Sequence, residues 1–176
     1  MKIRRCLLAA LCVAAACSSG GGEATTTTIP PAPAVTADPC SLLSDEAVGA
    51  LSDDIERTGT SDEVSGEHSC AWRNINGLAV VSLRVGSVGS STLDEEIARV
   101  GLAGDRYVTV EAVGDEAVAI FRGRTDAGQG ERLDAVLVRS GTGIIELRMP
   151  GLDIGDEADP AFGLATGLAG QAVAAL

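Results

Sequence analysis

The fold is decided by one stretch in the second half of the chain, Leu133-Asp134-Ala135-Val136-Leu137-Val138-Arg139-Ser140-Gly141-Thr142-Gly143-Ile144-Ile145-Glu146-Leu147-Arg148-Met149. Apolar and polar residues alternate on either side of residues 140–143, and a short glycine-containing segment between two such runs indicates a β-hairpin. The alternation predicts that the second strand points its apolar residues into the core and points Glu146 and Arg148 outward. One-sided strands of this kind belong to an antiparallel sheet with a polar or partly covered second face.

The same alternation marks further strands on the N-terminal side of the hairpin, at residues 78–85, 107–113 and 116–121. A polar, acidic stretch at residues 52–67 is expected to be a loop, and a first strand is expected to begin at Cys70-Ala71-Trp72. These elements predict an α+β domain in which two or three helices pack on an antiparallel sheet of about five or six strands, with one disulfide.

Capping residues predict where the helices start. Ser44 precedes a short helix to about residue 51, and Asp159 precedes a helix from Pro160 to about residue 175. Thr92 begins the middle helix with a capping box, and the apolar stripe of that helix is expected to dock on the sheet. The stripe consists of Leu93, Ile97 and Val100.

Gly163 and Gly167 form a G-x-x-x-G pair in the last helix. In an apolar segment this pattern is also found on the faces of membrane helix dimers. A helix of about sixteen residues is short for a membrane span, so we expect small residues to let the helix sit close on the sheet. The face expected to pack there consists of Phe162, Ala165, Leu168, Ala169 and Ala172.

The first 16 residues have the layout of an export signal. Three basic residues precede an apolar core at residues 7–16, which is too short to span a hydrocarbon layer of about 30 Å. Three alanines lead into Cys17, and this end resembles the lipobox of bacterial lipoproteins, with Ala14 where the usual pattern has leucine. The resemblance implies that Cys17 is acylated, with fatty acids such as palmitate, and becomes the new N-terminus. An ordinary cleaved signal is the alternative.

Residues 17–37 are expected to be the lipidated N-terminus and a linker rich in Thr, Pro and Gly, and residues 38–176 a single globular domain. The Thr/Pro run is either an O-glycosylated stalk or a bare spacer. Without its signal the chain has ten basic and 25 acidic residues, a formal charge of −15. This charge disfavours nucleic acid and anionic head groups as partners, so membrane attachment depends on the acyl chains at Cys17.

Cys40 and Cys70 remain when Cys17 is acylated. An isolated pair of cysteines in an exported chain indicates a disulfide, which contributes about 3–4 kcal/mol in the chain-entropy model. A zinc site would need further ligands at regular spacing, and His68 is the only histidine in the chain.

Three motifs follow one another in the mature chain: Asp38-Pro39-Cys40-Ser41-Leu42-Leu43, then Cys70-x-Trp72, then Gly114-Asp115-Glu116-Ala117. In this order they resemble a family of small actinobacterial secreted lipoproteins that is known only as a domain of unknown function. The resemblance covers residues 38–176 and implies a lipid-anchored envelope protein with a Cys40–Cys70 bridge. It implies no catalytic residues, because the family has no established chemistry.

No arrangement of residues in the sequence predicts catalysis or a cofactor. His68 is the only imidazole base, and no nucleophile signature accompanies it. One loop contains four acidic residues, Asp153, Asp156, Glu157 and Asp159. They lack the alternating ligand spacing of an EF-hand, and some of them are the acidic residues that favour the start of the following helix. We therefore expect a non-enzymatic protein without a metal site, with calcium at this loop as an open alternative.

These features favour a lipoprotein of the cell envelope, exported and held by its acyl chains on the outer face of the cytoplasmic membrane. We expect it to bind a small apolar ligand or lipid between the sheet and a helix, where pockets commonly form. The alternative is an adaptor or sensor that contacts another envelope protein through its acidic surface. An internal apolar cavity would favour the first hypothesis, and a solid core with a patterned surface would favour the second.

Overall fold

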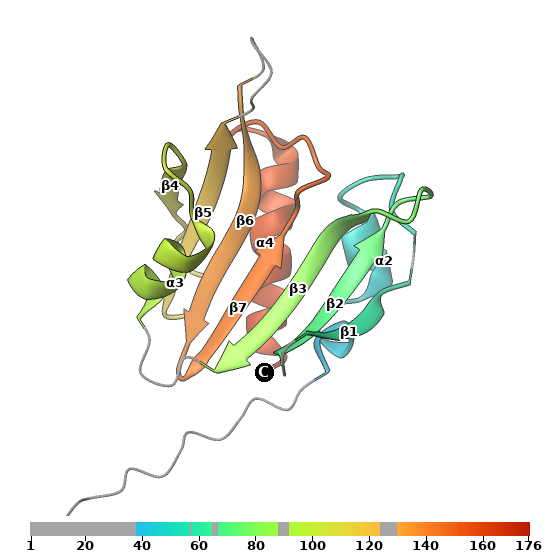
Figure 1. Cartoon of the computed structure of the whole chain (residues 1–176), viewed down its shortest axis with the longest axis horizontal. Helices are drawn as coiled ribbons and strands as arrows, with labels where there is room; N and C mark the ends of the chain where they lie inside the picture. The colour runs from blue at the N-terminus through green and yellow to red at the C-terminus, as the bar shows by residue number, and fades with distance from the viewer. Residues whose placement is uncertain (1–37, 57, 65–66, 88–91, 124–129) are drawn as a thin grey trace, which may run out of the picture. The chain divides into compact units, whose positions relative to one another are not determined.

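The computed structural model describes residues 38–176 except residues 57, 65–66, 88–91 and 124–129. The predicted signal, the linker and the lipidation site Cys17 lie outside the described residues. Within them, seven strands form one antiparallel sheet in the order β1-β2-β3-β7-β6-β5-β4 (Figure 1). The strands are β1 (Thr60–Val64), β2 (Glu67–Arg73), β3 (Ala79–Ser87), β4 (Arg106–Thr109), β5 (Glu116–Gly123), β6 (Glu131–Ser140) and β7 (Gly143–Arg148).

The predicted hairpin is confirmed as the centre of the sheet. Strands β6 and β7 pair without interruption from Ala135 opposite Arg148 to Ser140 opposite Gly143. β7 continues the sheet through β3, and β6 continues it through β5. Gly141 has a φ of 56°, a left-handed conformation that glycine adopts without steric cost and that a two-residue hairpin turn requires.

The sheet has seven strands where five or six were expected, and four helices accompany it where two or three were expected. The additional strand is β1, which lies inside the stretch predicted to be a loop. It is an edge strand made mainly of polar residues, so it has no apolar alternation to reveal it. Its backbone is held by pairing with β2 from Thr60 opposite Ala71 to Val64 opposite Glu67.

The additional helix is α1 (Pro39–Leu42), a single turn in which the Asp38 carboxylate accepts a hydrogen bond from the backbone N–H of Cys40. The three predicted helices are α2 (Asp45–Gly49), α3 (Leu93–Val100) and α4 (Pro160–Ala174). Their predicted caps are confirmed. Ser44, Thr92 and Asp159 each accept a hydrogen bond from a backbone N–H of the first turn, and Thr92 with Glu95 forms the complete capping box.

The helices lie on opposite faces of the sheet. Helices α1, α2 and α4 cover one face, where their apolar residues join the main core, and α3 covers part of the other face over β5 and β6 (Figure 1). Trp72, Leu83, Phe121 and Leu147 are fully buried in the main core. As a result, charged residues of the sheet lie beside α3, whereas apolar residues of the sheet lie beside α4.

Helix α4 packs through alanine and leucine rather than through its glycines. Its buried residues are Ala165, Leu168, Ala169 and Ala172. Gly163 and Gly167 are exposed, and a Cβ added at either would meet nothing within 4 Å. The predicted face of α4 is confirmed. The small residues that let the helix sit close on the sheet are its alanines, and the two glycines take no part in this contact.

The N-terminal motifs converge on one end of the main core. The disulfide joins Cys40 of α1 to Cys70 of β2, as predicted. Asp45 at the start of α2 accepts hydrogen bonds from the buried Trp72 indole at 2.9 Å and from the backbone N–H of Gly59 at 3.1 Å. A Cβ at Gly59 would lie 2.5 Å from the Cys70 sulfur and 2.8 Å from the Trp72 ring. The disulfide, the indole and one carboxylate thus hold α1 and α2 on the sheet.

We expect Asp45→Ala to destabilise the protein by about 1–3 kcal/mol, because it leaves the Trp72 indole N–H and the Gly59 N–H without an acceptor. Glu46→Ala removes the same charge from the same helix turn but from an exposed side chain, so it should change stability by less than about 0.5 kcal/mol. Urea unfolding followed by Trp72 fluorescence measures both variants. Equal losses for the two variants would show that the carboxylate acts only through the helix dipole.

Candidate functional site

A groove of about 860 Å³ opens beside α3, at the end of the sheet where β5 begins and β6 ends. The N-terminal half of α3 forms one wall, residues 109–118 form the other, and the turn between β6 and β7 closes one end. The volume lies within the range of about 300–1,000 Å³ that is usual for small-molecule sites. Both apolar and polar side chains line the groove, so it is amphipathic.

The apolar part of the lining comes from α3 and β5. Leu93 is buried, and Ile97 and Val118 are partly buried against a cluster on this face of the sheet. The predicted stripe on α3 therefore docks on the sheet as expected, and its first two members also line the groove. The remaining members of the cluster are Val100, Ile120, Ala135, Leu137 and Ile144.

The opposite wall contains the motif Gly114-Asp115-Glu116-Ala117. Gly114 has a φ of 61°, and a Cβ there would lie 2.5 Å from a Val138 methyl group and 2.6 Å from the Arg139 carbonyl oxygen. Only glycine lets the chain approach β6 this closely. The motif therefore has a structural reason that sequence alone did not reveal: it presses the β4–β5 connection against the neighbouring strand.

The two acidic residues of the motif tie the wall to the β6–β7 hairpin. The Asp115 carboxylate accepts a hydrogen bond from the Gly141 backbone N–H at 2.7 Å, and the Asp115 N–H donates to the Arg139 carbonyl at 2.8 Å. Glu116 pairs with Arg139 through two contacts of 3.1 and 3.2 Å. The hydrogen bond that Arg139 donates to Glu116 raises the pKa of the Arg139 guanidinium. These contacts engage both carboxylates and hold the wall in place.

Ala112 adds backbone strain to this wall. Its φ is 61°, and among the described residues it is the one non-glycine residue with a positive φ. A side chain in this conformation costs about 1–2 kcal/mol. Such strain persists where the surrounding structure imposes it, and it is concentrated at ligand-binding sites.

Two carboxylates on the rim remain open to a ligand. Asp94 of α3 and Glu111 of the β4–β5 connection both line the groove and are exposed. Among the described residues neither side chain has an ion-pair partner. The rim of the groove is therefore acidic above its apolar floor.

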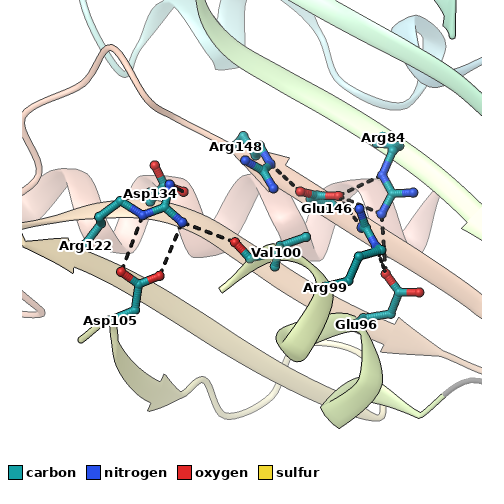
Figure 2. A network of polar contacts seen from close by, with 9 residues as sticks. All are labelled: Arg84, Glu96, Arg99, Val100, Asp105, Arg122, Asp134, Glu146 and Arg148. Carbon is teal, nitrogen blue, oxygen red and sulfur yellow. Dashed lines mark hydrogen bonds and ion pairs between the residues drawn. The ribbon is translucent and has the colours of Figure 1, made fainter. Parts of the chain in front are cut away.

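On its other side, α3 is held by a network of ion pairs around Glu146 (Figure 2). Glu146 accepts from Arg84 at 2.7 Å, from Arg99 at 2.9 Å and from Arg148. Glu96, also on α3, lies 2.7 Å from Arg99 and 3.5 Å from Arg84. Because Glu96 and Arg99 belong to α3 and the other residues belong to the sheet, the network fixes where α3 lies.

The predicted outward direction of Glu146 is confirmed, but this direction does not lead into solvent. Its side chain is only 4% exposed. It does point away from the main core, as the alternation required, but α3 and the arginine side chains cover that face. A carboxylate in such a place is tolerated only when it is paired and hydrogen-bonded, and three guanidinium groups meet this requirement.

The C-terminal end of α3 has a second anchor. Arg122 of β5 donates to the Val100 carbonyl at 3.2 Å and pairs with Asp105 at 3.2 Å and with Asp134 at 3.0 Å (Figure 2). Burial opposes the charge of Arg122, but the two carboxylates outweigh it and raise its pKa. A cation at this position also interacts favourably with the negative end of the helix.

The residues considered for metal or acid–base chemistry lie apart from this groove. His68 is exposed on β2. In the acidic loop, Asp156 and Asp159 accept hydrogen bonds from nearby backbone N–H groups, and Glu157 pairs with Arg106 at 2.6 Å, which lowers the pKa of Glu157. Within the described part of the chain, no three His, Cys, Asp or Glu side chains gather as a metal would require.

The sequence predicted a ligand between the sheet and a helix, without indicating which helix. The space between α4 and the sheet is filled by side chains of the core, and the groove lies beside α3. Among the helices that the structure describes, none has both the length and the apolar character needed to span a membrane.

The sequence analysis identified both Leu93 and the motif at residues 114–117, but only as part of a helix stripe and as a family signature. No sequence signal showed that they face each other.

The pattern of a family described as a protein of unknown function (DUF3558) matches residues 12–132, more than half of the chain. No curated protein and no solved structure matches the chain.

We expect Glu146→Gln to destabilise the protein by about 1–3 kcal/mol, because three guanidinium groups lose their shared counter-charge while the shape of the side chain is kept. Hydrogen exchange of the α3 amides should accelerate more than that of the α4 amides. Glu116→Gln, which breaks an exposed ion pair, serves as the matched control and should cost at most about 1 kcal/mol. If α3 exchanged no faster in Glu146→Gln than in the control, the network would not be what positions the helix.

Proposed function

The chain belongs to this family of unknown function, and from that premise we propose that it is a lipid-anchored binding protein of the cell envelope. In this proposal it is one of the actinobacterial secreted lipoproteins that its motifs resemble, and Cys17 carries its acyl chains. The groove beside α3 binds a small amphiphilic ligand or lipid, and no reaction is catalysed.

One observation carries the proposal: the groove combines ligand-sized volume with an apolar floor and a polar rim. Hydrocarbon against Leu93, Ile97 and Val118 gains about 25 cal/mol for each Å² of apolar surface removed from water. The polar groups of the rim then orient the head of the ligand. Sites of this composition are typical of small-molecule binding proteins.

The construction of the walls supports binding. The wall at residues 109–118 is tied to the β6–β7 hairpin by Asp115 and Glu116, and α3 is tied to the sheet through Glu146. A site built from rigid elements loses little conformational entropy when a ligand enters, so more of the contact energy appears as affinity. Because Asp115 and Glu116 are engaged in these contacts, they serve as supports of the groove in this proposal.

A second candidate function rests on the rim. Asp94 and Glu111 are exposed carboxylates without an ion-pair partner among the described residues, and the chain as a whole has a formal charge of −12. An acidic groove of this kind also suits a basic segment of another envelope protein, for which the domain would be an adaptor. Charge reversal at both positions should then abolish cross-linking to that partner on cells and leave attachment to the membrane unchanged.

We expect the full-length protein, purified from the membranes of a bacterial host that acylates lipoproteins, to retain a ligand in the groove. Native mass spectrometry should show an adduct in a one-to-one ratio that is lost on denaturation. Thr109→Trp should abolish the adduct, because Thr109 is an exposed residue of β4 that lines the groove and a tryptophan there fills it. Thr58→Trp places the same side chain at an exposed position outside the groove and should keep the adduct. A wild-type mass without this adduct would reject ligand retention and favour the adaptor hypothesis.

We expect Cys17→Ser to release the protein from the membrane, since the proposed acyl chains account for its attachment and a single apolar signal of this length does not span the bilayer. Detergent-phase partitioning and intact mass measure the change. Cys12→Ser removes the neighbouring signal cysteine and should leave both unchanged. If the Cys17→Ser protein still had the additional mass of the acyl chains, a residue other than Cys17 would be the lipidation site.

A further inference from the structure

The groove beside α3 contains more negative than positive charge. Among the described residues, the charged side chains that line it are those of Asp94, Glu111, Asp115, Glu116 and Arg139. Four carboxylates and one guanidinium group give the lining a formal charge of −3. Clefts lined by charges of one sign concentrate ions of the opposite sign, so this excess bears on which ligands can enter.

The single cation of this lining is already paired. Arg139 uses two of its nitrogens on the Glu116 carboxylate, at 3.1 and 3.2 Å, and the pair as a unit is neutral. Asp115 accepts a hydrogen bond from the Gly141 backbone N–H, which holds the carboxylate in place and leaves its negative charge. The excess negative charge of the lining therefore belongs to Asp94, Glu111 and Asp115.

The positive end of α3 does not offset this charge. A helix N-terminus has the equivalent of about half a positive charge. Glu95 lies at that end as part of the capping box with Thr92, and Asp94 adds a second carboxylate to the same turn. Two full negative charges exceed the half charge of the helix. Because Thr92 and Glu95 already form the cap, Asp94 is not needed for it.

The acidic rim lies next to the apolar floor. Leu93 and Asp94 are consecutive residues of α3, and both line the groove. Asp94 belongs to the wall formed by α3, and Glu111 belongs to the wall formed by residues 109–118. Both side chains are exposed. A ligand whose hydrocarbon lies on the floor therefore brings its polar group to a rim with a carboxylate on each wall.

We propose that the ligand of the groove is a cationic amphiphile, a molecule that joins a hydrocarbon group to an amine with a positive charge at neutral pH. This inference rests on the proposed binding function of the groove and names the class of its ligand. The hydrocarbon packs on the apolar floor, and the ammonium group donates charge-assisted hydrogen bonds to Asp94, to Glu111 or to both. Amphiphiles with a carboxylate or phosphate group are disfavoured, because they meet like charges without a free cation.

Three probes with the same hydrocarbon group test the proposal: hexylammonium, hexanol and hexanoate, at neutral pH and equal ionic strength. Each is titrated into the full-length protein in non-ionic detergent, and the NMR shifts of the amides at residues 109–118 measure its affinity. We expect hexylammonium to bind at least about tenfold more tightly than hexanoate, with hexanol between them. Added sodium chloride should weaken the binding of hexylammonium more than that of hexanol.

A double variant, Asp94→Asn with Glu111→Gln, removes two charges of the rim and keeps the size of both side chains. It should lose most of the preference for hexylammonium over hexanol and keep the wild-type affinity for hexanol. The matched control is Asp53→Asn with Asp54→Asn, which removes two charges from exposed side chains outside the groove. The control should keep the wild-type preference.

The results separate a failure of this inference from a failure of the proposed function. If hexanoate binds as tightly as hexylammonium and Thr109→Trp blocks both, the groove binds ligands without selecting cations, and this inference alone is wrong. If no probe shifts these amides, or if Thr109→Trp leaves the shifts unchanged, the groove is not the site and both proposals are rejected. An equal loss of preference in the two double variants would also overturn the inference, because the preference would then follow from the charge of the whole protein.

Discussion

The arrangement on one face of this sheet depends on a single carboxylate, Glu146 on the central strand β7, which is almost entirely removed from water. Such a group is stable only with counter-charges and hydrogen bonds around it. Two of its three arginines come from strands and one from α3, so the requirement of the carboxylate also decides where α3 lies. The ion pairs around Glu146 lie on one side of that helix, and the groove lies on its other side.

The opposite face follows a different rule. Apolar side chains of α1, α2 and α4 pack on the sheet there, and the disulfide and the Asp45–Trp72 hydrogen bond hold the shortest helices in place. The main core and the proposed binding groove therefore lie on different faces of the sheet. The main core provides most of the apolar burial, and the charged face provides the surfaces at which a ligand can meet rigid walls without disturbing that core.

Much of the fold could be predicted because it follows from local patterns. The alternation around residues 140–143 predicted the β6–β7 hairpin, and Ser44, Thr92 and Asp159 predicted three helix starts. β1 was missed because an edge strand of polar residues is stabilised by its backbone pairing with β2, which leaves no apolar period in its own sequence. The packed face of α4 was predicted from its spacing, but only the structure shows that its alanines, and not Gly163 and Gly167, lie against the sheet.

By itself, the sequence determined the antiparallel sheet, the pairing of Cys40 with Cys70 and the two faces of each strand, because these depend on periodicity and on the chemistry of nearby residues. Only the tertiary structure decided what covers the second face. Alternation says that Glu146 and its neighbours in the core point to opposite sides of β7, but it cannot say that α3 lies over one of them. The groove was likewise invisible, because Leu93 and Gly114 come from separate segments whose approach is set by long-range packing and ion pairs.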